Sequence, residues 1–463
     1  MSSDSALAAA LVLGLTAACS GPATSDRALP ARASSADVLA APAPAEGPEA
    51  PAADAAPPAR VDSGDLDALV ARAVAEHPAV VAARHRWRAA LERAPQVSKL
   101  PEPTLTLGAW PSPVETRSGP MRGRLGLSQR LPWKGKLSLA EEAALKRAEA
   151  EAQRLEATVL AVERDVRAAW AELAWLRHAE ELNRLQLELL SQVEAVTRSR
   201  YETGRAHHAD LVRIQVELGR TEDRIAELVD AQRPARERLR SAIGGGAVLP
   251  DAPAWDAVAA RAAAIAPPGD DLARLAATNP DLRALTLEAD AAAVDEDRAG
   301  LERRPDFVVG ADWTVVGEGP STFADAGRDA LAVTMALTLP IRGEAYDAAE
   351  HEARARRGDA LSRRRALLLD LTTAWEEWSF RARDAIRRWR LYEQALVPKA
   401  DEAYSVALSA YRTDEATFQD VLDAARVLLE FRLLEARAAA DLVVADAELR
   451  RLAPEAPEAP ADR

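Results

Sequence analysis

The spacing of apolar residues changes its period along the chain, and each change predicts a new element. Leucine, valine and alanine recur at helical spacing from Asp65 to about Ala94. Residues 104–110 and 124–131 instead alternate apolar and polar side chains, and residues 111–123 between them are rich in proline and glycine. This pattern predicts one β-hairpin with an apolar and a polar face, with residues 111–123 as its loop.

A very long helix is predicted after the hairpin. Helical spacing returns after Gly135 and continues for about 65 residues, until residues 200–205 interrupt it. At about 1.5 Å per residue such a helix would extend for about 100 Å. Because this exceeds a globular core, the helix must pack along its length against other helices. A further helix follows and ends near residues 244–246.

The same order of elements then occurs a second time. Residues 307–315 and 331–339 form a second alternating pair, and another very long helical pattern follows it. The segment around Tyr411 corresponds to the interruption at Tyr201. Several landmarks that match in the same order indicate an internal duplication.

The two strand-to-helix junctions anchor this duplication. Their residues are Pro132, Trp133, Gly135, Pro340 and Gly343. Each proline is predicted to end a strand and to start the long helix, since proline suits a first helical turn but not the interior of a sheet. We expect Lys134 and Lys136 to be interfacial anchors.

The duplication divides the chain into segments. They are a signal in residues 1–19, a tether in 20–62, the first structural repeat in 63–246, a connector in 247–270, the second structural repeat in 271–452 and a flexible tail in 453–463. The Ala/Pro-rich tether is expected to be disordered because it lacks the apolar side chains that offset ordering entropy. The predicted fold class is mainly α with a small β part, a tandem duplication of helix, β-hairpin, long helix and helix.

Composition supports long helices and excludes some functions. The chain of 463 residues is rich in Ala, Leu, Glu and Arg, and only 4% of it is aromatic. Its formal net charge of −14 argues against nucleic-acid binding through a broad basic surface. Cys19 is the single cysteine, which excludes an intrachain disulfide and a Cys-based metal site.

An apolar run at residues 6–18 stops at Cys19. It resembles a bacterial lipoprotein signal, in which Cys19 is lipidated and becomes the mature N-terminus. Ser20, rather than aspartate, follows the cysteine, and this resembles the lipoproteins that are sorted to the outer membrane. Two features differ from that pattern, since no Lys or Arg precedes the run and Thr16 stands where leucine is expected. The alternative is an ordinary secretory signal with an incidental cysteine.

Four predicted strands cannot close a barrel, and open sheet edges do not occur in a bilayer. If the strands span a membrane, several chains must therefore share one barrel, and strands of about 9–11 residues have the required length. Trp110, Trp133 and Trp313 lie near strand ends, where an aromatic girdle would sit. The alternative for these tryptophans is packing within loops or the core.

These features resemble the TolC-type outer-membrane efflux family. The resemblance rests on the duplicated order of elements, on Gln-Arg-Leu-Pro-Trp-Lys-Gly-Lys at residues 129–136, and on Tyr201 and Gly204 followed by Asp210. It covers about residues 65–452 and implies a homotrimer in which a 12-stranded outer-membrane β-barrel continues into a 12-helix periplasmic α-barrel.

The resemblance also implies a function and partners. It implies a passive exit duct for metal ions or drugs in a tripartite pump, together with a periplasmic adaptor, an inner-membrane transporter of the RND type and outer-membrane lipids. The Pro-Trp-Lys-Gly-Lys form of the first junction is most similar to members that work with heavy-metal exporters.

Matching the family residue by residue implies a gate at the two helix interruptions. Asp210, Asp420 and Asp423 match acidic positions of the closed tip, and threefold symmetry would make them carboxylate rings that attract cations. The alternative for each aspartate is a solvated helix face. The residues implied in adaptor docking are Tyr201, Gly204, Arg205, Thr413 and Asp414.

The gate implied by the resemblance differs from the family pattern in two places. Tyr411 matches a gate tyrosine, but the gate arginine falls on Ala416, so that Arg412 or Arg205 would have to replace it. Residues 413–414 replace the usual glycine-containing turn, so we expect a tip of different shape.

Residues 207–208 are a pair of histidines beside the first tip. Adjacent residues on a helix diverge by about 100° and cannot easily chelate one ion together, which favours a solvated or adaptor-contacting tip over a metal site. The His351–Glu352 pair lacks the second histidine of a zinc-protease helix, and no phosphate loop, nucleophile elbow or cofactor fingerprint occurs. We therefore expect no enzyme activity and no cofactor.

Two other protein classes also contain long helical hairpins. A periplasmic adaptor would have one hairpin flanked by lipoyl-like halves, whereas this chain has two hairpins in tandem. A soluble coiled-coil scaffold would leave the four alternating strands unexplained.

Overall fold

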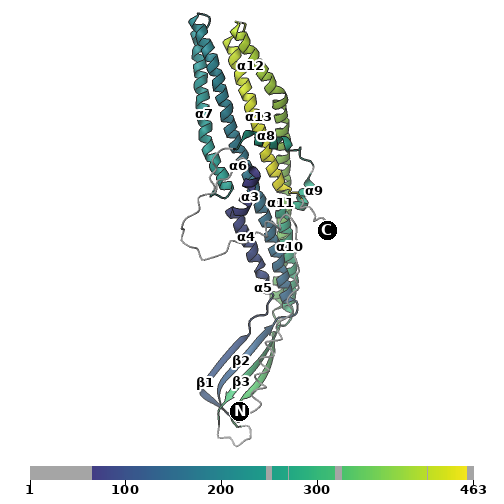
Figure 1. The fold of residues 1–463 in the computed structure, drawn as a ribbon. Coiled ribbons are helices and arrows are strands. Elements are labelled where there is room, and N and C mark those ends of the chain that lie inside the picture. The colour runs from purple at the N-terminus through teal and green to yellow at the C-terminus, as the bar shows by residue number, and fades with distance from the viewer. Residues whose placement is uncertain (1–64, 247–252, 270, 319–325, 414, 456–463) are drawn as a thin grey trace, which may run out of the picture. The chain divides into compact units, whose positions relative to one another are not determined.

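The structure is a computed structural model that describes residues 65–246, 253–269, 271–318, 326–413 and 415–455. All of these residues fall within one unit, residues 49–455. Helices dominate it, as the sequence predicted, and its strands form one sheet (Figure 1). The predictions for Cys19, for the signal and for the tether lie outside the described residues.

The first half of the chain begins with short helices and ends with a long helical hairpin. Its elements are α3 (Leu66–Glu76), α4 (Pro78–Leu91), α5 (Arg93–Val97), β1 (Thr104–Thr116), β2 (Gly119–Leu131), α6 (Lys136–Glu202) and α7 (His208–Ala242). The 67 residues of α6 confirm the very long helix that the apolar spacing predicted.

The second half repeats this order. Its elements are α9 (Leu272–Thr278), α10 (Pro280–Gly300), η1 (Leu301–Arg303), β3 (Phe307–Val316), β4 (Ala330–Leu337), α11 (Gly343–Leu391), η2 (Tyr392–Leu396), α12 (Val397–Arg412) and α13 (Phe418–Leu452). A further helix, α8 (Trp255–Ala264), lies in the segment between the halves and packs against α6 and α13.

The sheet has the strand order β1-β2-β3-β4, and every neighbouring pair is antiparallel. The expected loop at residues 111–123 is wrong, because β1 continues to Thr116 and β2 begins at Gly119. The two prolines that suggested a loop, Pro111 and Pro113, lie where the register shifts between Ala109 and Val114. Proline is tolerated there because the pairing with β2 is interrupted between these two residues, so its missing N–H breaks no hydrogen bond to β2.

The two faces of the sheet differ in polarity. Cross-strand pairing brings leucine, valine, methionine and tryptophan side chains onto one face, and several are largely exposed, among them Leu107 at 74%, Val333 at 73% and Met335 at 71%. The other face carries an ion pair between Arg124 and Asp312, whose Nη2 and Oδ1 atoms are 2.8 Å apart. Gly126 makes room for it, since a Cβ at this position would lie 2.3 Å from the Asp312 carboxylate.

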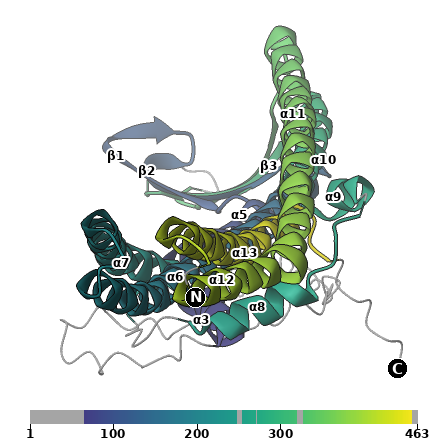
Figure 2. The ribbon, with the colours of Figure 1, turned by 90° about the horizontal axis from the view of Figure 1, so that it is seen from above.

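Helix packing forms the core. The long helix α6 contacts α4, α7, α10 and α13, and much of the buried surface is alanine, with the large side chains of Trp170 and Leu173 fully buried. Small side chains allow long helices to approach closely along their whole length. Figure 1 shows the hairpins α6–α7 and α12–α13 side by side, and Figure 2 shows α10 beside α11. Within the described ranges, no helix is both long enough and apolar enough to cross a membrane.

Prolines near the long helices have effects that the apolar pattern did not indicate. The second very long helix is confirmed, but it contains a π-helical turn, η2, between α11 and α12 just before Pro398. Proline has no N–H and clashes with the carbonyl four residues earlier, and a π turn accommodates both effects. Pro132 and Pro340 do not start helices, since α6 begins at Lys136 and α11 at Gly343.

Candidate functional site

The first helical hairpin reverses at residues 203–207, and in the second hairpin α12 ends at Arg412 and α13 begins at Phe418. In the first, Gly204 adopts a φ of +70°, and its N–H donates to the Tyr201 carbonyl at 3.0 Å. Glycine accepts this left-handed conformation without strain, which ends α6 and reverses the chain. Tyr201, Gly204, Arg205 and Thr413 are all exposed at these turns. Asp414 lies outside the described residues.

Tyr411 is buried between the two hairpins. Its side chain is only 3% exposed, and its hydroxyl lies 3.2 Å from Thr197 Oγ1 on α6. The guanidinium of Arg200, also on α6, lies 4.5 Å from the centre of the Tyr411 ring and donates to the Tyr411 carbonyl. Tyr411 therefore links α12 to α6, which connects the second half of the chain to the first.

The arginine on Tyr411 is not one that the sequence suggested. Arg412 and Arg205 were the arginines expected beside Tyr411, but both are exposed, and the guanidinium that lies on its ring is that of Arg200. Arg200 directly precedes Tyr201 in the first half, whereas Tyr411 belongs to the second. No periodicity within one half indicates which residue of the other half will face it.

Below the turns, an apolar cluster joins the hairpins. Its buried members include Leu190 and Val193 of α6, Ile214 of α7, and Val421 and Leu422 of α13. On its surface, Arg426 of α13 donates from Nε to Glu217 Oε1 of α7 at 3.1 Å. The apolar pattern does not predict this ion pair between the second helices of the two hairpins, because charged positions on long helices are ordinarily solvated.

Asp210 and Asp420 occupy equivalent positions, each at the start of the second helix of its hairpin. The Asp420 carboxylate accepts from the Thr417 hydroxyl at 2.6 Å and from the Thr417 backbone N–H at 2.8 Å. These two hydrogen bonds lower the pKa of Asp420. Asp210 accepts from the backbone N–H of His207 at 3.4 Å. Both aspartates therefore cap the helices that follow the turns.

Asp423 is exposed one turn further along α13. It accepts from Gln419 Nε2 at 3.0 Å and lies 3.4 Å from Arg426 Nη1. Nearby, the ring of His208 lies 5.8 Å from that of Tyr201. The described residues hold no group of three or more His, Cys, Asp or Glu side chains that could bind a metal ion.

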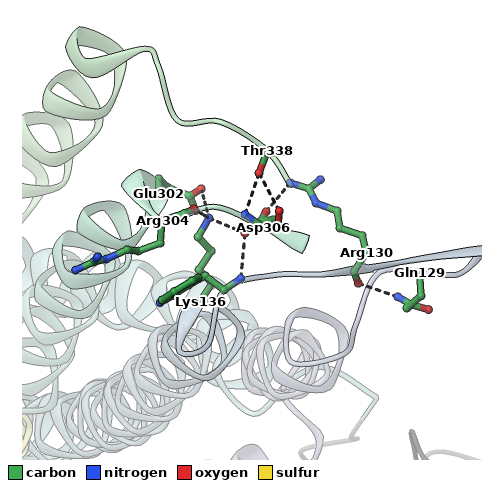
Figure 3. A network of polar contacts seen from close by, with 8 residues as sticks. Gln129, Arg130, Lys136, Glu302, Arg304, Asp306 and Thr338 are labelled. Carbon is green, nitrogen blue, oxygen red and sulfur yellow. Dashed lines mark hydrogen bonds and ion pairs between the residues drawn. The ribbon is translucent and has the colours of Figure 1, made fainter. Parts of the chain in front are cut away.

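The first strand-to-helix junction forms a polar network with the second half of the chain. Lys136, expected to be an interfacial anchor, is instead only 8% exposed, and its Nζ donates to Asp306 Oδ1 at 2.9 Å (Figure 3). If Lys136 reached outward instead, the buried Asp306 carboxylate would lose one of its compensating charges, which is costly. Lys134 is exposed. Trp133 stacks on Phe307, with ring centres 6.1 Å apart.

The glycines of the two junctions differ. Gly135 precedes α6 with a φ of +98°, and a Cβ there would lie 3.1 Å from Leu301. Gly343 is the first residue of α11, and a Cβ there would meet no atom within 4 Å. The first junction is therefore tightly packed, while the second is open.

Comparisons by sequence and by fold both match this chain to outer-membrane proteins. A family model described as "Outer membrane efflux protein" matches residues 69–245. No curated protein sequence matches the chain.

Three solved structures share the fold. The outer-membrane channel OprN is 19% identical, covers 84% of this chain and 89% of its own, and has a TM-score of 0.68. The outer membrane protein VceC from Vibrio cholerae is 20% identical, with 84% and 95% covered and a TM-score of 0.66. CusC, in which conformational changes accompany folding and transmembrane channel formation, is 15% identical, with 85% and 92% covered and a TM-score of 0.70.

The family match lies in the first half of the chain, and the similar fold extends over both halves. Residues 69–245 thus match the outer membrane efflux protein family model, and the fold of both halves is similar to that of solved outer-membrane channels.

Proposed function

We propose that three copies of this chain form an outer-membrane exit duct of a tripartite efflux pump. The observation that carries the proposal is the two-faced sheet joined to very long helices. One face exposes large apolar side chains such as Leu107 and Val333, and the other carries the Arg124–Asp312 pair. An apolar outer face and a polar inner face are the requirements of a membrane barrel that encloses water.

The edges of the sheet support a trimer. Strands β1 and β4 each lack a partner on one side within the described sheet, and a bilayer contains no water to satisfy such edges. Three copies would pair these edges into a 12-stranded barrel, and six helical hairpins would continue it as a 12-helix periplasmic α-barrel. The chain would then consist of the repeats 63–246 and 271–452, joined by the connector 247–270 and followed by the tail 453–463.

The helical turns would be the gate of this duct. Tyr411 holds α12 against α6 through Thr197 and Arg200, which is a contact that opening would have to break. Asp210, Asp420 and Asp423, repeated in three copies, would form carboxylate rings that favour cations. The hydrogen bonds that these carboxylates accept leave further lone pairs available, since an ionised carboxylate accepts about four hydrogen bonds.

The partners of the duct follow from its place in a pump. Tyr201, Gly204, Arg205, Thr413 and Asp414 would dock a periplasmic adaptor, and an RND-type transporter in the inner membrane would supply metal ions or drugs. The likeness to the outer membrane protein VceC and to the outer-membrane channel OprN supports this placement. The signal in residues 1–19 would direct export, Cys19 would carry a lipid, and residues 20–62 would tether it to the body.

Reconstitution of the purified full-length protein tests the duct. We expect a trimer after chemical cross-linking, heat-modifiable gel mobility, recovery in the outer-membrane fraction, and stepwise ion conductance in planar bilayers. A monomer that stays out of membranes would contradict the proposal and would favour a scaffold protein.

The carboxylate rings have their own test. Trivalent cations should block single-channel current in the wild type, and the block should weaken in the Asp420→Ala/Asp423→Ala variant. Block of the same strength in both proteins would exclude the rings while leaving the duct intact.

A further inference from the structure

One buried carboxylate collects contacts from the segments that join the sheet to the helices. Asp306 directly precedes β3 and is only 5% exposed. Figure 3 shows side chains from β2, from the start of α6 and from the residue after β4 pointing toward it. In the sequence, Asp306 belongs to the segment that leads into the second alternating pair of strands, and the pattern assigned its side chain no role.

Three groups of the first half of the chain bind the Asp306 carboxylate. Arg130 Nη2, at the end of β2, donates to Oδ2 at 2.7 Å, and the backbone N–H of Trp133 donates to Oδ1 at 3.0 Å. Lys136 Nζ, in the first turn of α6, donates to the same Oδ1 at 2.9 Å. One carboxylate therefore fixes the end of β2, the linker and the start of α6.

The same residue is held from β4 through its backbone. The Thr338 N–H donates to the Asp306 carbonyl at 2.9 Å, and the Asp306 N–H donates to Thr338 Oγ1 at 2.9 Å. Thr338 is the first residue after β4, on the path to α11. Asp306 thus also fixes the segment that leads into the second long helix.

Lys136 closes the network on the other side. Besides Asp306, its Nζ lies 3.1 Å from Glu302 Oε2 and 3.3 Å from the Arg304 carbonyl. Two cations, Arg130 and Lys136, therefore face two carboxylates, so the charges balance. Nearby, Gln129 Nε2 donates to the Pro101 carbonyl at 2.7 Å, which ties the segment before β1 to the same place.

We propose that Asp306 is a positioning residue that locks the sheet to both long helices and makes the strand-to-helix joint one rigid piece. Its position is suited to this, because β2, β3 and β4 all meet their helical connections there. Hydrogen bonds to a charged, nearly buried acceptor are stronger than those between neutral groups. Loss of the Asp306 carboxylate would deprive Arg130 and Lys136 of a negative charge that both of them contact. Neither membrane insertion nor the proposed duct is needed for this role.

Hydrogen exchange of the full-length protein tests the lock. In Asp306→Asn, which keeps the shape but removes the charge, we expect the amides of Trp133 and Thr338 to exchange about tenfold faster or more than in the wild type. The matched control is Asp312→Asn, which removes an ion pair from the same strand away from the joint. There, exchange at Trp133 and Thr338 should remain at the wild-type rate.

Two outcomes would overturn the proposal. One is faster exchange at Trp133 without any change at Thr338, since the two sides of the joint would then be independent. The other is an equal effect of Asp312→Asn, which would indicate general weakening of the strand. If Asp306→Asn does not fold, Thr338→Val serves instead, and it should accelerate exchange at Asp306 and at Trp133.

Rigidity can be measured directly by the distance between spin labels on the two sides of the joint. Labels introduced through unnatural amino acids at Thr106 of β1 and Glu142 of α6, both exposed, leave Cys19 untouched. Labelled chains diluted with unlabelled ones report distances within one chain. The distribution should broaden in Asp306→Asn and stay narrow in Asp312→Asn, and equal widths in both variants would exclude a lock.

Discussion

At the residue scale, the duplication provides pairs of equivalent side chains in different surroundings. Tyr411 is buried against Thr197 and Arg200, whereas Tyr201, the corresponding residue of the first half, is 42% exposed. Of these two equivalent tyrosines, one therefore fastens the hairpins together and the other faces outward at a turn.

Tyr411→Phe should loosen the contact between the hairpins. The change removes the hydrogen bond to Thr197 and keeps the ring under Arg200, so the expected loss is about 1 kcal/mol, or about fivefold in the local opening equilibrium. Hydrogen exchange of amides in α12 and the end of α6 measures it. Tyr201→Phe is the matched control and should change exchange by less than about twofold, and an equal effect of both variants would contradict the assigned role of Tyr411.

The Asp420 cap should depend on pH. Because hydrogen bonds from Thr417 lower the pKa of Asp420 in the folded protein, the cap stabilises the start of α13 above the unfolded carboxyl pKa of about 4. This stabilisation is lost as the pH falls through the lower, folded pKa. Exchange at the Thr417 amide should therefore be slower in the wild type than in Asp420→Asn at pH of about 7, and this difference should shrink as the pH falls below about 4.

The control for this pH dependence is Asp423→Asn, which changes an exposed carboxylate that caps no helix. It should leave exchange at the Thr417 amide unchanged at neutral and at acidic pH. A difference between wild type and Asp420→Asn that persists in acid would show that the side-chain shape, not its charge, stabilises the turn.

At the element scale, the glycines at the two strand-to-helix junctions differ in conformation and in the space around them. Gly135 has a φ of +98° and little space for a methyl group, while Gly343 is the first helical residue of α11 and has open space around it. The sequence pattern treats these two glycines as equivalents, but only one of them requires glycine.

Alanine substitutions separate the two glycines. Gly135→Ala should destabilise the protein by about 1–2 kcal/mol, because an L side chain is strained at this φ. Gly343→Ala should be neutral or stabilising by up to about 1 kcal/mol, since alanine favours a helix. Denaturant titration in detergent, followed by helical circular dichroism, measures both, and equal destabilisation by both substitutions would contradict the difference between the two positions.

At the scale of the whole molecule, the sheet has one apolar and one polar face, and neighbouring residues of one strand point to opposite faces. Val333 and Thr334 of β4 therefore belong to different faces at the same height in the sheet. This pair tests which face contacts lipid, as the proposed duct requires.

Val333→Lys should impair insertion into the outer membrane, because a lysine on a lipid-facing position near the membrane centre costs about 2–4 kcal/mol. Thr334→Lys, on the polar face, should insert nearly as well as the wild type. The yield of heat-modifiable trimer in the outer-membrane fraction measures both variants. A stronger defect in Thr334→Lys would reverse the assignment of the faces.

Part of the fold could be predicted from hydrophobic periodicity alone. The strand pairs, the helix that follows Gly135 and the break near Tyr201 all follow from side chains that must share one face. The errors arose at prolines. Pro111 and Pro113 lie within an edge strand, and Pro398 converts a continuous helix into one with a π turn. Periodicity does not report whether a backbone N–H will be needed at a given position.

Site residues could be predicted only where their contacts lie within one half of the chain. The capping aspartates Asp210 and Asp420 lie beside the turns that the sequence identified. In contrast, the hydroxyl partner of Tyr411 is 214 residues away and the Asp306 partner of Lys136 is 170 residues away, each in the other half. Arg200 and Asp306 could not be assigned from sequence, since no local pattern specifies which residues of two long helices or two hairpins come to lie opposite.

The sequence by itself determined the order, the type and the approximate length of the elements, and the polarity of each face, because these depend on local spacing of apolar side chains. Only the tertiary structure decided how the halves are joined, since that depends on register across the sheet and between helices. At the tip, register places Arg200 on Tyr411, and at the joint it buries Lys136 against Asp306. Burial then makes these polar contacts strong, since water no longer competes for them.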